Sequence, residues 1–223
     1  MNKDTSRMTR RTHTVERIRT ERLIAVIRTQ TPDEAVHVGR VLVEVGISLL
    51  EVTFTVPNAP QAIERLCRDV PQAVVGAGSV IHADDAQAAI QAGAQFVVSP
   101  VGYLDLVGIC HRQDVVAIPA GLTPTEVLTA YEAGAEFVKV FPADAVGGAA
   151  YLRALLAPLP HVPLIPTGGV TMQNVRDFLQ AGAVAVGVGG ALTPRSLIQA
   201  ADWAALKAHA ARFVAAMSQS VQA

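Results

Sequence analysis

The 223-residue chain has few lysines, cysteines and aromatic residues, and its net charge is close to zero. A formal charge of -1 gives no broad electrostatic field, so we expect neither nucleic acid nor an anionic membrane surface as a partner. Cys67 and Cys110 form no CxxC pattern, which excludes a disulfide framework and indicates a reduced, cytoplasmic protein. The six histidines are scattered without metal-ligand spacing, so we predict no metal site.

Long apolar runs are also missing. No run approaches the roughly 18 residues that a membrane-spanning helix needs, because Gly, Pro or a charge interrupts each one. Residues 1–20 are rich in Arg and Thr and lack the apolar core of a signal peptide. We therefore expect an N-terminal tail or helix over 1–20, helical at about 14–19, followed by a single domain over 21–223.

Apolar residues make up 51% of the chain, which is enough for a large core. Short β-branched runs alternate with longer Ala-rich amphipathic stretches, a pattern typical of successive βα units. Helical patterns include 32–45, 59–68, 83–91, 125–133 and 175–180. The expected strands are 23–27, 49–54, 73–76, 96–98, 115–118, 137–140, 164–166 and 184–188.

The βα unit is repeated in the sequence. Ala-Gly-Ala at 92–94, 133–135 and 181–183 places a glycine where a helix ends and a strand follows. Thr31 and Thr123 each precede a proline and a glutamate, the pattern of a helix start. We predict a single (β/α)8 TIM barrel with a short N-terminal helical extension; an open doubly wound sheet is the alternative, although no GxGxxG follows the first strand.

Lys139 lies in an apolar run expected to be the sixth strand, whereas the other lysines are Lys3 in the tail and Lys207 in the last helix. Burial lowers the pKa of a lysine, and a neutral amine is the nucleophile that forms a Schiff base with a ketone. The alternatives are a lysine whose ammonium group reaches solvent at the barrel mouth and one paired with a carboxylate.

Glu51 lies within the second expected strand. Alternation places Glu51, Thr53 and Thr55 on one face, toward the barrel interior, and the intervening apolar residues toward the helices. Glu51 and Lys139 then share one cavity, where a carboxylate beside an imine can move protons. A plain buried salt bridge is the alternative.

Further candidates follow the strands, at the end of a barrel where active sites lie. The glycines of Thr167-Gly168-Gly169 and of Gly189-Gly190 predict backbone donors for a phosphate, or simply tight turns. Arg28 follows the first strand and is able to fix a carboxylate through two hydrogen bonds. Ser79 and Pro100, which follow the third and fourth strands, are further candidates for substrate binding, and Ser79 adds a hydroxyl. Thr53 and Thr55, on the same face as Glu51, are also candidate substrate-binding residues.

Together these segments resemble the 2-keto-3-deoxy-6-phosphogluconate (KDPG) aldolase family, including its 4-hydroxy-2-oxoglutarate (KHG) aldolase activity. The resemblance extends from Arg22 to Leu192 in matching order. It rests on Arg28, EVTFTVP (51–57), GAGSV (76–80), VSP (98–100), LTPTE (122–126), VKVFPA (138–143) and PTGGV (166–170).

The resemblance implies a class I aldolase, a carbon-carbon lyase on a (β/α)8 barrel, usually homotrimeric and needing no metal or organic cofactor. It implies a Schiff base on Lys139 and general acid/base catalysis by Glu51. Its partners are small 2-keto acids and aldehydes. The remaining implied roles are carboxylate binding by Arg28 and Ser79, substrate packing by Phe141, and phosphate binding by Gly168, Gly169, Gly189 and Gly190.

The chain departs from the family pattern in ways that keep other substrates open. A family serine at the phosphate end appears here as Ala191, and an arginine of some members appears as Thr55. KHG and unphosphorylated 2-keto-3-deoxy acids, including galactonate types, are therefore alternative substrates to KDPG. An isomerase or synthase that uses Lys139 without a covalent bond, and a non-catalytic sugar-acid binding protein, are the other readings.

Overall fold

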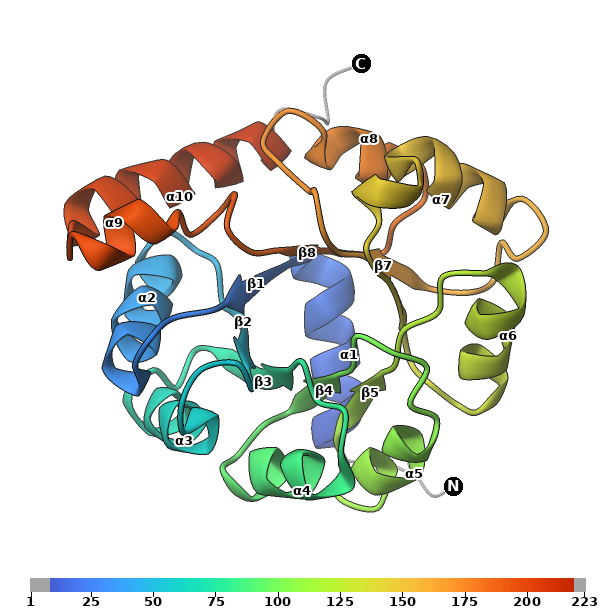
Figure 1. The fold of residues 1–223 in the computed structure, drawn as a ribbon, viewed down its shortest axis with the longest axis horizontal. Helices are drawn as coiled ribbons and strands as arrows, with labels where there is room; N and C mark the ends of the chain where they lie inside the picture. Colours follow the sequence, from blue (N-terminus) through green and yellow to red (C-terminus); the bar gives the residue numbers. More distant parts are fainter. Residues whose placement is uncertain (1–8, 219–223) are drawn as a thin grey trace, which may run out of the picture.

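The computed structural model describes residues 9–218, which form a parallel α/β fold (Figure 1). Eight strands alternate with helices along the chain. The strands are β1 (Leu23–Ile27), β2 (Leu49–Thr53), β3 (Val74–Gly78), β4 (Phe96–Val98), β5 (Val116–Ile118), β6 (Val138–Val140), β7 (Leu164–Pro166) and β8 (Val186–Val188). The helices are α1 (Arg10–Glu21), α2 (Pro32–Glu44), α3 (Ala59–Asp69), α4 (Ala83–Gln91), α5 (Asp105–His111), α6 (Pro124–Glu132), 3-10 helix η1 (Asp144–Val146), α7 (Gly148–Leu156), α8 (Val175–Gln180), α9 (Arg195–Gln199) and α10 (Trp203–Ser218).

The strands form a curled six-stranded parallel sheet, in the order β5-β4-β3-β2-β1-β8, and a parallel pair, β6-β7. Isolated parallel bridges join Ala120 to Lys139 and Thr167 to Gly187, at the two gaps between these units. Figure 1 shows helices arranged around the strands, with α1 behind their centre. The curled arrangement differs from the open doubly wound sheet considered as the alternative.

Two apolar clusters follow from strand alternation. In the outer cluster, Leu50 and Val52 of β2 pack with buried residues of the surrounding helices. The inner cluster contains Leu49 of β2, Phe137 just before β6, and Ile18 of α1. The predicted direction of the β2 side chains is therefore confirmed, and α1 belongs to the inner core.

Arginines hold α1 across the amino-terminal ends of the strands. Arg22 donates to the carbonyls of Ala183 and Val184, and Arg17 donates to Ser48 Oγ at 2.7 Å. On the other side, the Arg10 backbone N–H donates to Asp114 at 2.8 Å. These contacts fix the helix on several sides of the curled sheet.

The predicted strands 23–27, 96–98 and 164–166 and the helices 83–91 and 175–180 have the expected bounds. The expected strand 49–54 ends one residue early because the Val56 N–H donates to the Thr53 carbonyl at 2.9 Å and closes a turn. The helix expected at about 14–19 is longer, at Arg10–Glu21. Residues 1–8 of the expected tail, with Lys3, lie outside the described residues.

Local signals in the sequence also have the expected geometry. Gly93, Gly134 and Gly182 have φ near +100°, a conformation that suits glycine at a helix end. Thr123 caps α6 and forms the predicted capping box with Glu126. Within residues 9–218, no helix combines the length and apolarity needed to cross a membrane.

Candidate active site

Glu51 and Lys139 lie next to the inner apolar cluster, on the side toward the carboxyl ends of the strands. Leu49 and Phe137, two residues earlier on the same strand faces, belong to that cluster. Both charged residues are buried, with Glu51 3% and Lys139 5% exposed. Each influences the pKa of the other, so β2 and β6 bring them to one interior site.

The Glu51 carboxyl group fills space that Gly78 leaves open. A Cβ atom at Gly78 would lie 2.6 Å from Glu51 Cδ, closer than real Cβ atoms approach. Within the described residues, buried Glu51 Oε1 has no hydrogen-bond partner. Burial raises the pKa of Glu51 from its ordinary 4.5, while the charges of Lys139 and Arg28 oppose this increase. A raised pKa suits a carboxyl group that both gives and accepts protons.

The backbone of Lys139 is held by the segment that follows β5. Its N–H donates to the Pro119 carbonyl at 2.9 Å, and its carbonyl accepts from Gly121 N–H at 2.9 Å. Burial lowers the pKa of Lys139 from 10.5, and Arg28 lowers it further, whereas Glu51 raises it. A larger fraction of the amine is therefore neutral than in an exposed lysine.

Lys139 and Glu51 do not form a direct salt bridge, because no ion pair within 4.0 Å joins them among the described residues. The Lys139 Nζ atom instead lies 4.9 Å from the centre of the Phe141 ring. Phe141 is 39% exposed and lines a cavity, so the amine lies beside a cavity wall.

The cavity beside Phe141 has a volume of about 290 Å³. The loops after β1, β6, β7 and β8 form its walls. Its lining contains most of the substrate-binding residues predicted from the sequence, namely Arg28, Phe141, Thr167, Gly168, Gly169, Gly189 and Gly190. The structure thus brings together residues that lie far apart in the chain.

Four other predicted binding residues do not line this cavity. Thr53 is buried and its hydroxyl donates to the Ile27 carbonyl at 3.1 Å, while Thr55 Oγ1 lies 2.7 Å from Thr53 Oγ1. Thr55 itself is exposed in the turn after β2. Ser79 directly follows β3 with φ of +59°, and half-buried Pro100 lies in the loop after β4. Their binding roles stay predictions.

Sequence reasoning missed several residues of the site. Val26, Val170, Thr171 and Gly187 also line the cavity. Thr167 packs over Gly187, where a Cβ atom would lie 3.1 Å from Thr167 Cγ2. Glycine within a strand signals a close approach, but it does not identify the approaching side chain.

A larger cavity of about 520 Å³ contains none of the predicted site residues. Its lining includes Arg10, Gln87 and Arg112, near α1, α4 and α5. No group of three or more His, Cys, Asp or Glu residues able to hold a metal ion occurs within residues 9–218. The predicted site therefore corresponds to the smaller cavity beside the buried lysine.

Comparison with known proteins agrees with this arrangement. Residues 14–209 match the sequence model of the KDPG and KHG aldolases. The chain belongs to the KDPG and KHG aldolase family. It is 35% identical over 187 residues to the 2-dehydro-3-deoxy-phosphogluconate aldolase of Treponema pallidum, covering 84% of this chain and 89% of that protein.

Solved structures have a similar fold. KDPG aldolase from Legionella pneumophila, crystallised with pyruvate captured as a covalent carbinolamine intermediate, has a TM-score of 0.78 and 29% identity, covering 88% of this chain and 93% of that one. A designed cube-shaped protein cage, made by fusing symmetric oligomeric domains, has a TM-score of 0.80 and 30% identity, with coverage of 88% and 72%. The resemblance inferred from the strand-end motifs is confirmed.

Proposed function

We propose that this protein is a class I aldolase that reversibly cleaves KDPG to pyruvate and glyceraldehyde 3-phosphate. The observation that carries the proposal is Lys139, a buried amine with a lowered pKa beside a cavity in a chain of this family. A neutral amine of this kind attacks a ketone, whereas an ammonium group does not.

The reaction begins when the Lys139 nitrogen attacks the keto carbon and forms a carbinolamine. Loss of water gives the protonated imine at C2, which accepts the electron pair of the C3–C4 bond when that bond breaks. Removal of the proton from the C4 hydroxyl then breaks the C3–C4 bond, releases the aldehyde and leaves an enamine on Lys139. Protonation of the enamine at C3 and hydrolysis of the imine release pyruvate and regenerate the amine.

Glu51 is the group that moves these protons. Its Oε1 atom has no partner among the described residues, so the oxygen is available to a bound water or substrate hydroxyl. Glu51 forms no direct salt bridge with Lys139 among the described residues, so its carboxyl group is not held by the amine that it serves. The raised pKa of Glu51 allows both the acid and base roles of one catalytic cycle.

The substrate lies along the cavity with its keto carbon at Lys139. Arg28, whose charge affects the pKa of both catalytic groups, holds the pyruvate carboxylate with help from Ser79. The other end of the substrate reaches the glycine loops after β7 and β8, where Gly168, Gly169, Gly189 and Gly190 supply backbone donors.

KHG and unphosphorylated 2-keto-3-deoxy acids are the second substrate class. Gly190 and Ala191 line the cavity without a hydroxyl group, so this wall has no hydroxyl donor for a phosphate. A rate comparison of phosphorylated and unphosphorylated substrates on the purified protein ranks the two classes.

Borohydride trapping with pyruvate tests the proposed chemistry. A class I aldolase yields a protein heavier by one reduced pyruvate, attached at Lys139. An unmodified protein that still binds sugar acids or phosphates would instead support the isomerase, synthase or binding-protein readings. A dehydrogenase-coupled assay of pyruvate release separates an aldolase from a binding protein.

We also propose that the eight strands close into a (β/α)8 barrel and that residues 21–223 form the single aldolase domain. Support comes from the bridges at β5/β6 and β7/β8. At the first gap the Lys139 N–H also donates to the Pro119 carbonyl at 2.9 Å, and at the second the Val184 N–H donates to the Leu164 carbonyl at 3.0 Å. We further propose a cytoplasmic homotrimer without a metal or organic cofactor. Exposed Ile81, Val101 and Leu104, in the loops after β3 and β4, provide an apolar surface for such an assembly.

A further inference from the structure

A second cavity adjoins the proposed substrate cavity. Its volume is about 230 Å³, and it shares Arg28 and Gly190 with the substrate cavity. The loop after β1, with the start of α2, forms one side, and the segment from Gly190 to α9 forms the other. Arg195, the first residue of α9, lines this second cavity but not the first.

The position of Arg195 is tied to the glycine loop that follows β8. The Leu192 and Thr193 N–H groups donate to the Gly189 carbonyl at 2.8 and 3.0 Å. The Thr193 hydroxyl donates to the same carbonyl at 3.3 Å. This compact turn holds the start of α9 close to the donors proposed for the distal end of the substrate.

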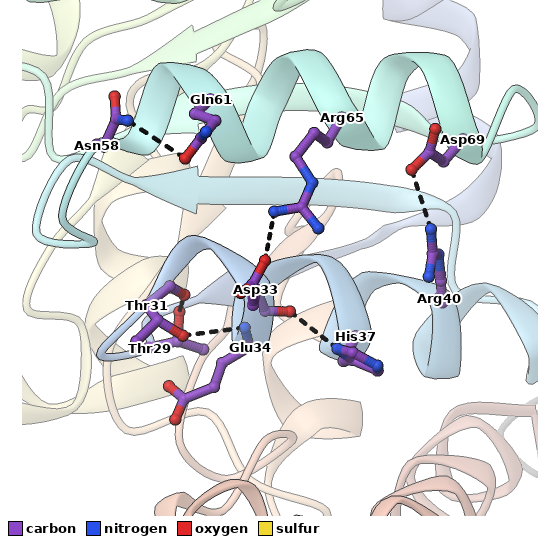
Figure 2. Close-up of polar contacts among 10 residues, drawn as sticks. All are labelled: Thr29, Thr31, Asp33, Glu34, His37, Arg40, Asn58, Gln61, Arg65 and Asp69. Atoms are coloured by element: carbon purple, nitrogen blue, oxygen red, sulfur yellow. Dashed lines mark hydrogen bonds and ion pairs between the residues drawn. The ribbon is translucent and has the colours of Figure 1, made fainter.

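The charges around the second cavity favour an anion. Within residues 9–218, neither Arg28 nor Arg195 has a hydrogen bond or ion pair to another side chain. Glu34 is the carboxylate in this lining, and its Oε2 accepts the Gln30 N–H at 2.8 Å. Figure 2 shows Glu34 at the start of α2, where its backbone N–H donates to Thr31 Oγ1. The two guanidinium groups therefore have free donors, whereas the carboxylate already has a local partner.

The substrate cavity offers a single cation to a substrate that carries an anionic group at each end. Arg28 is the one charged residue that lines this cavity within the described chain. If Arg28 binds the pyruvate carboxylate, the distal phosphate lacks a charged partner there. A phosphate carries roughly 1.5 to 2 negative charges at neutral pH, and arginine binds it through paired hydrogen bonds.

We propose that Arg195 binds the distal anionic group of the substrate and makes the enzyme prefer acids with a phosphate at that end. The inference rests on the proposed aldolase function and extends it to substrate selection. The phosphate lies over Gly189 and Gly190, with the Arg195 guanidinium reaching it from the neighbouring cavity. Arg195 is a specificity residue and takes no part in the covalent steps.

The test compares Arg195→Ala with the wild type on two substrates that differ only at the distal end, KDPG and unphosphorylated 2-keto-3-deoxygluconate. Loss of a charge-assisted hydrogen bond is expected to raise the KM for KDPG by about tenfold or more. The kcat for KDPG and the kcat/KM for 2-keto-3-deoxygluconate stay within about twofold. Arg195→Lys keeps the charge but loses the paired donors, so its KM lies between those of the wild type and Arg195→Ala.

Arg212→Ala, an exposed change on α10, is the matched control and leaves both substrates unaffected. An unchanged KM for KDPG in Arg195→Ala, or equal losses on both substrates, overturns the inference. Borohydride trapping with pyruvate separates the two proposals. If the wild type and Arg195→Ala are both trapped, such a kinetic result overturns only the role of Arg195; if the wild type is not trapped, the aldolase function and this inference both fail.

Discussion

Gly78→Ala provides a sharp test of the role of Glu51 because it perturbs the carboxyl group without altering it chemically. A Cβ atom at Gly78 would lie 2.6 Å from Glu51 Cδ and 2.7 Å from Glu51 Cγ. Both distances are below the 3.0 Å that real Cβ contacts respect, so the side chain must move. Gly78 has no positive φ, and alanine therefore adds no backbone strain at this position.

The expected loss follows from the position of the carboxyl group. Positioned acid/base groups contribute about 10²- to 10⁴-fold to a rate, so a displaced carboxylate lowers kcat by at least about 10²-fold. That loss equals about 2.7 kcal/mol of transition-state stabilisation, at about 1.36 kcal/mol for each factor of ten. Crowding in the buried site also lowers the free energy of unfolding by about 1 to 3 kcal/mol.

The assay measures pyruvate release and pyruvate trapping for the single variants and for the double variant with Glu51→Gln. If Gly78→Ala acts through Glu51, the double variant is hardly slower than Glu51→Gln alone. Trapping at Lys139 persists because the amine itself is unchanged. Gly108→Ala, within α5, is the control. Its added Cβ would lie 3.4 Å from the end of the flexible Arg112 side chain, which is an ordinary contact distance far from Glu51 in sequence.

Fully additive losses in the double variant would refute this reasoning, because Gly78 would then act independently of Glu51. A wild-type rate in a folded Gly78→Ala protein would also refute the idea that the position of the Glu51 carboxyl group matters for catalysis. Circular dichroism and chemical denaturation establish that the variant remains folded. The combination of Gly78→Ala with Glu51→Ala should recover the lost stability, since the smaller side chain removes the crowding.

The remaining predictions concern the amine, the carboxyl group and the assembly. Lys139→Ala abolishes turnover in the coupled assay; activity within about tenfold of the wild type would count against a covalent intermediate. Glu51→Gln slows turnover by about 10²-fold or more with trapping retained, and an unchanged rate would reduce Glu51 to a structural role. Because burial lowers the pKa of Lys139 from 10.5, its initial trapping rate rises with pH as the amine deprotonates, with a midpoint below pH 10.5; a midpoint at or above this pH would contradict the effect of burial. Light scattering should give three copies of the 23.4 kDa chain, with less assembly in Val101→Asp, whereas a wild-type monomer would rule out the trimer.

Strand periodicity predicted much of the architecture because it reports local physics. The alternation in β2 correctly placed Leu50 and Val52 toward the helices, and the lone charged residue of β6 identified Lys139 as unusual. Thr123 and Glu126 likewise form a capping box that depends only on neighbouring residues. Local signals of this kind can be recognised in the sequence without knowledge of the tertiary structure.

Contacts between distant segments were less predictable. The alternation could not show that a turn closes after Thr53 and leaves Phe54, the last residue of the expected strand, outside β2. It also gave no sign that Arg195 lines a cavity shared with Arg28, because these residues are far apart in sequence. The space that Gly78 leaves for Glu51 depends on the register of β2 and β3, which pairs Thr53 with Gly78.

Helix α1 has a consequence for the order in which the products depart. Ile18 packs into the inner cluster beneath the proposed reaction centre, so substrate and products cannot pass through that end of the fold. Both products must use the exit beside Phe141 and the glycine loops. Under the proposed mechanism, the aldehyde leaves first, while pyruvate is still bound covalently to Lys139 deeper in the fold. The two products are therefore released in a fixed order.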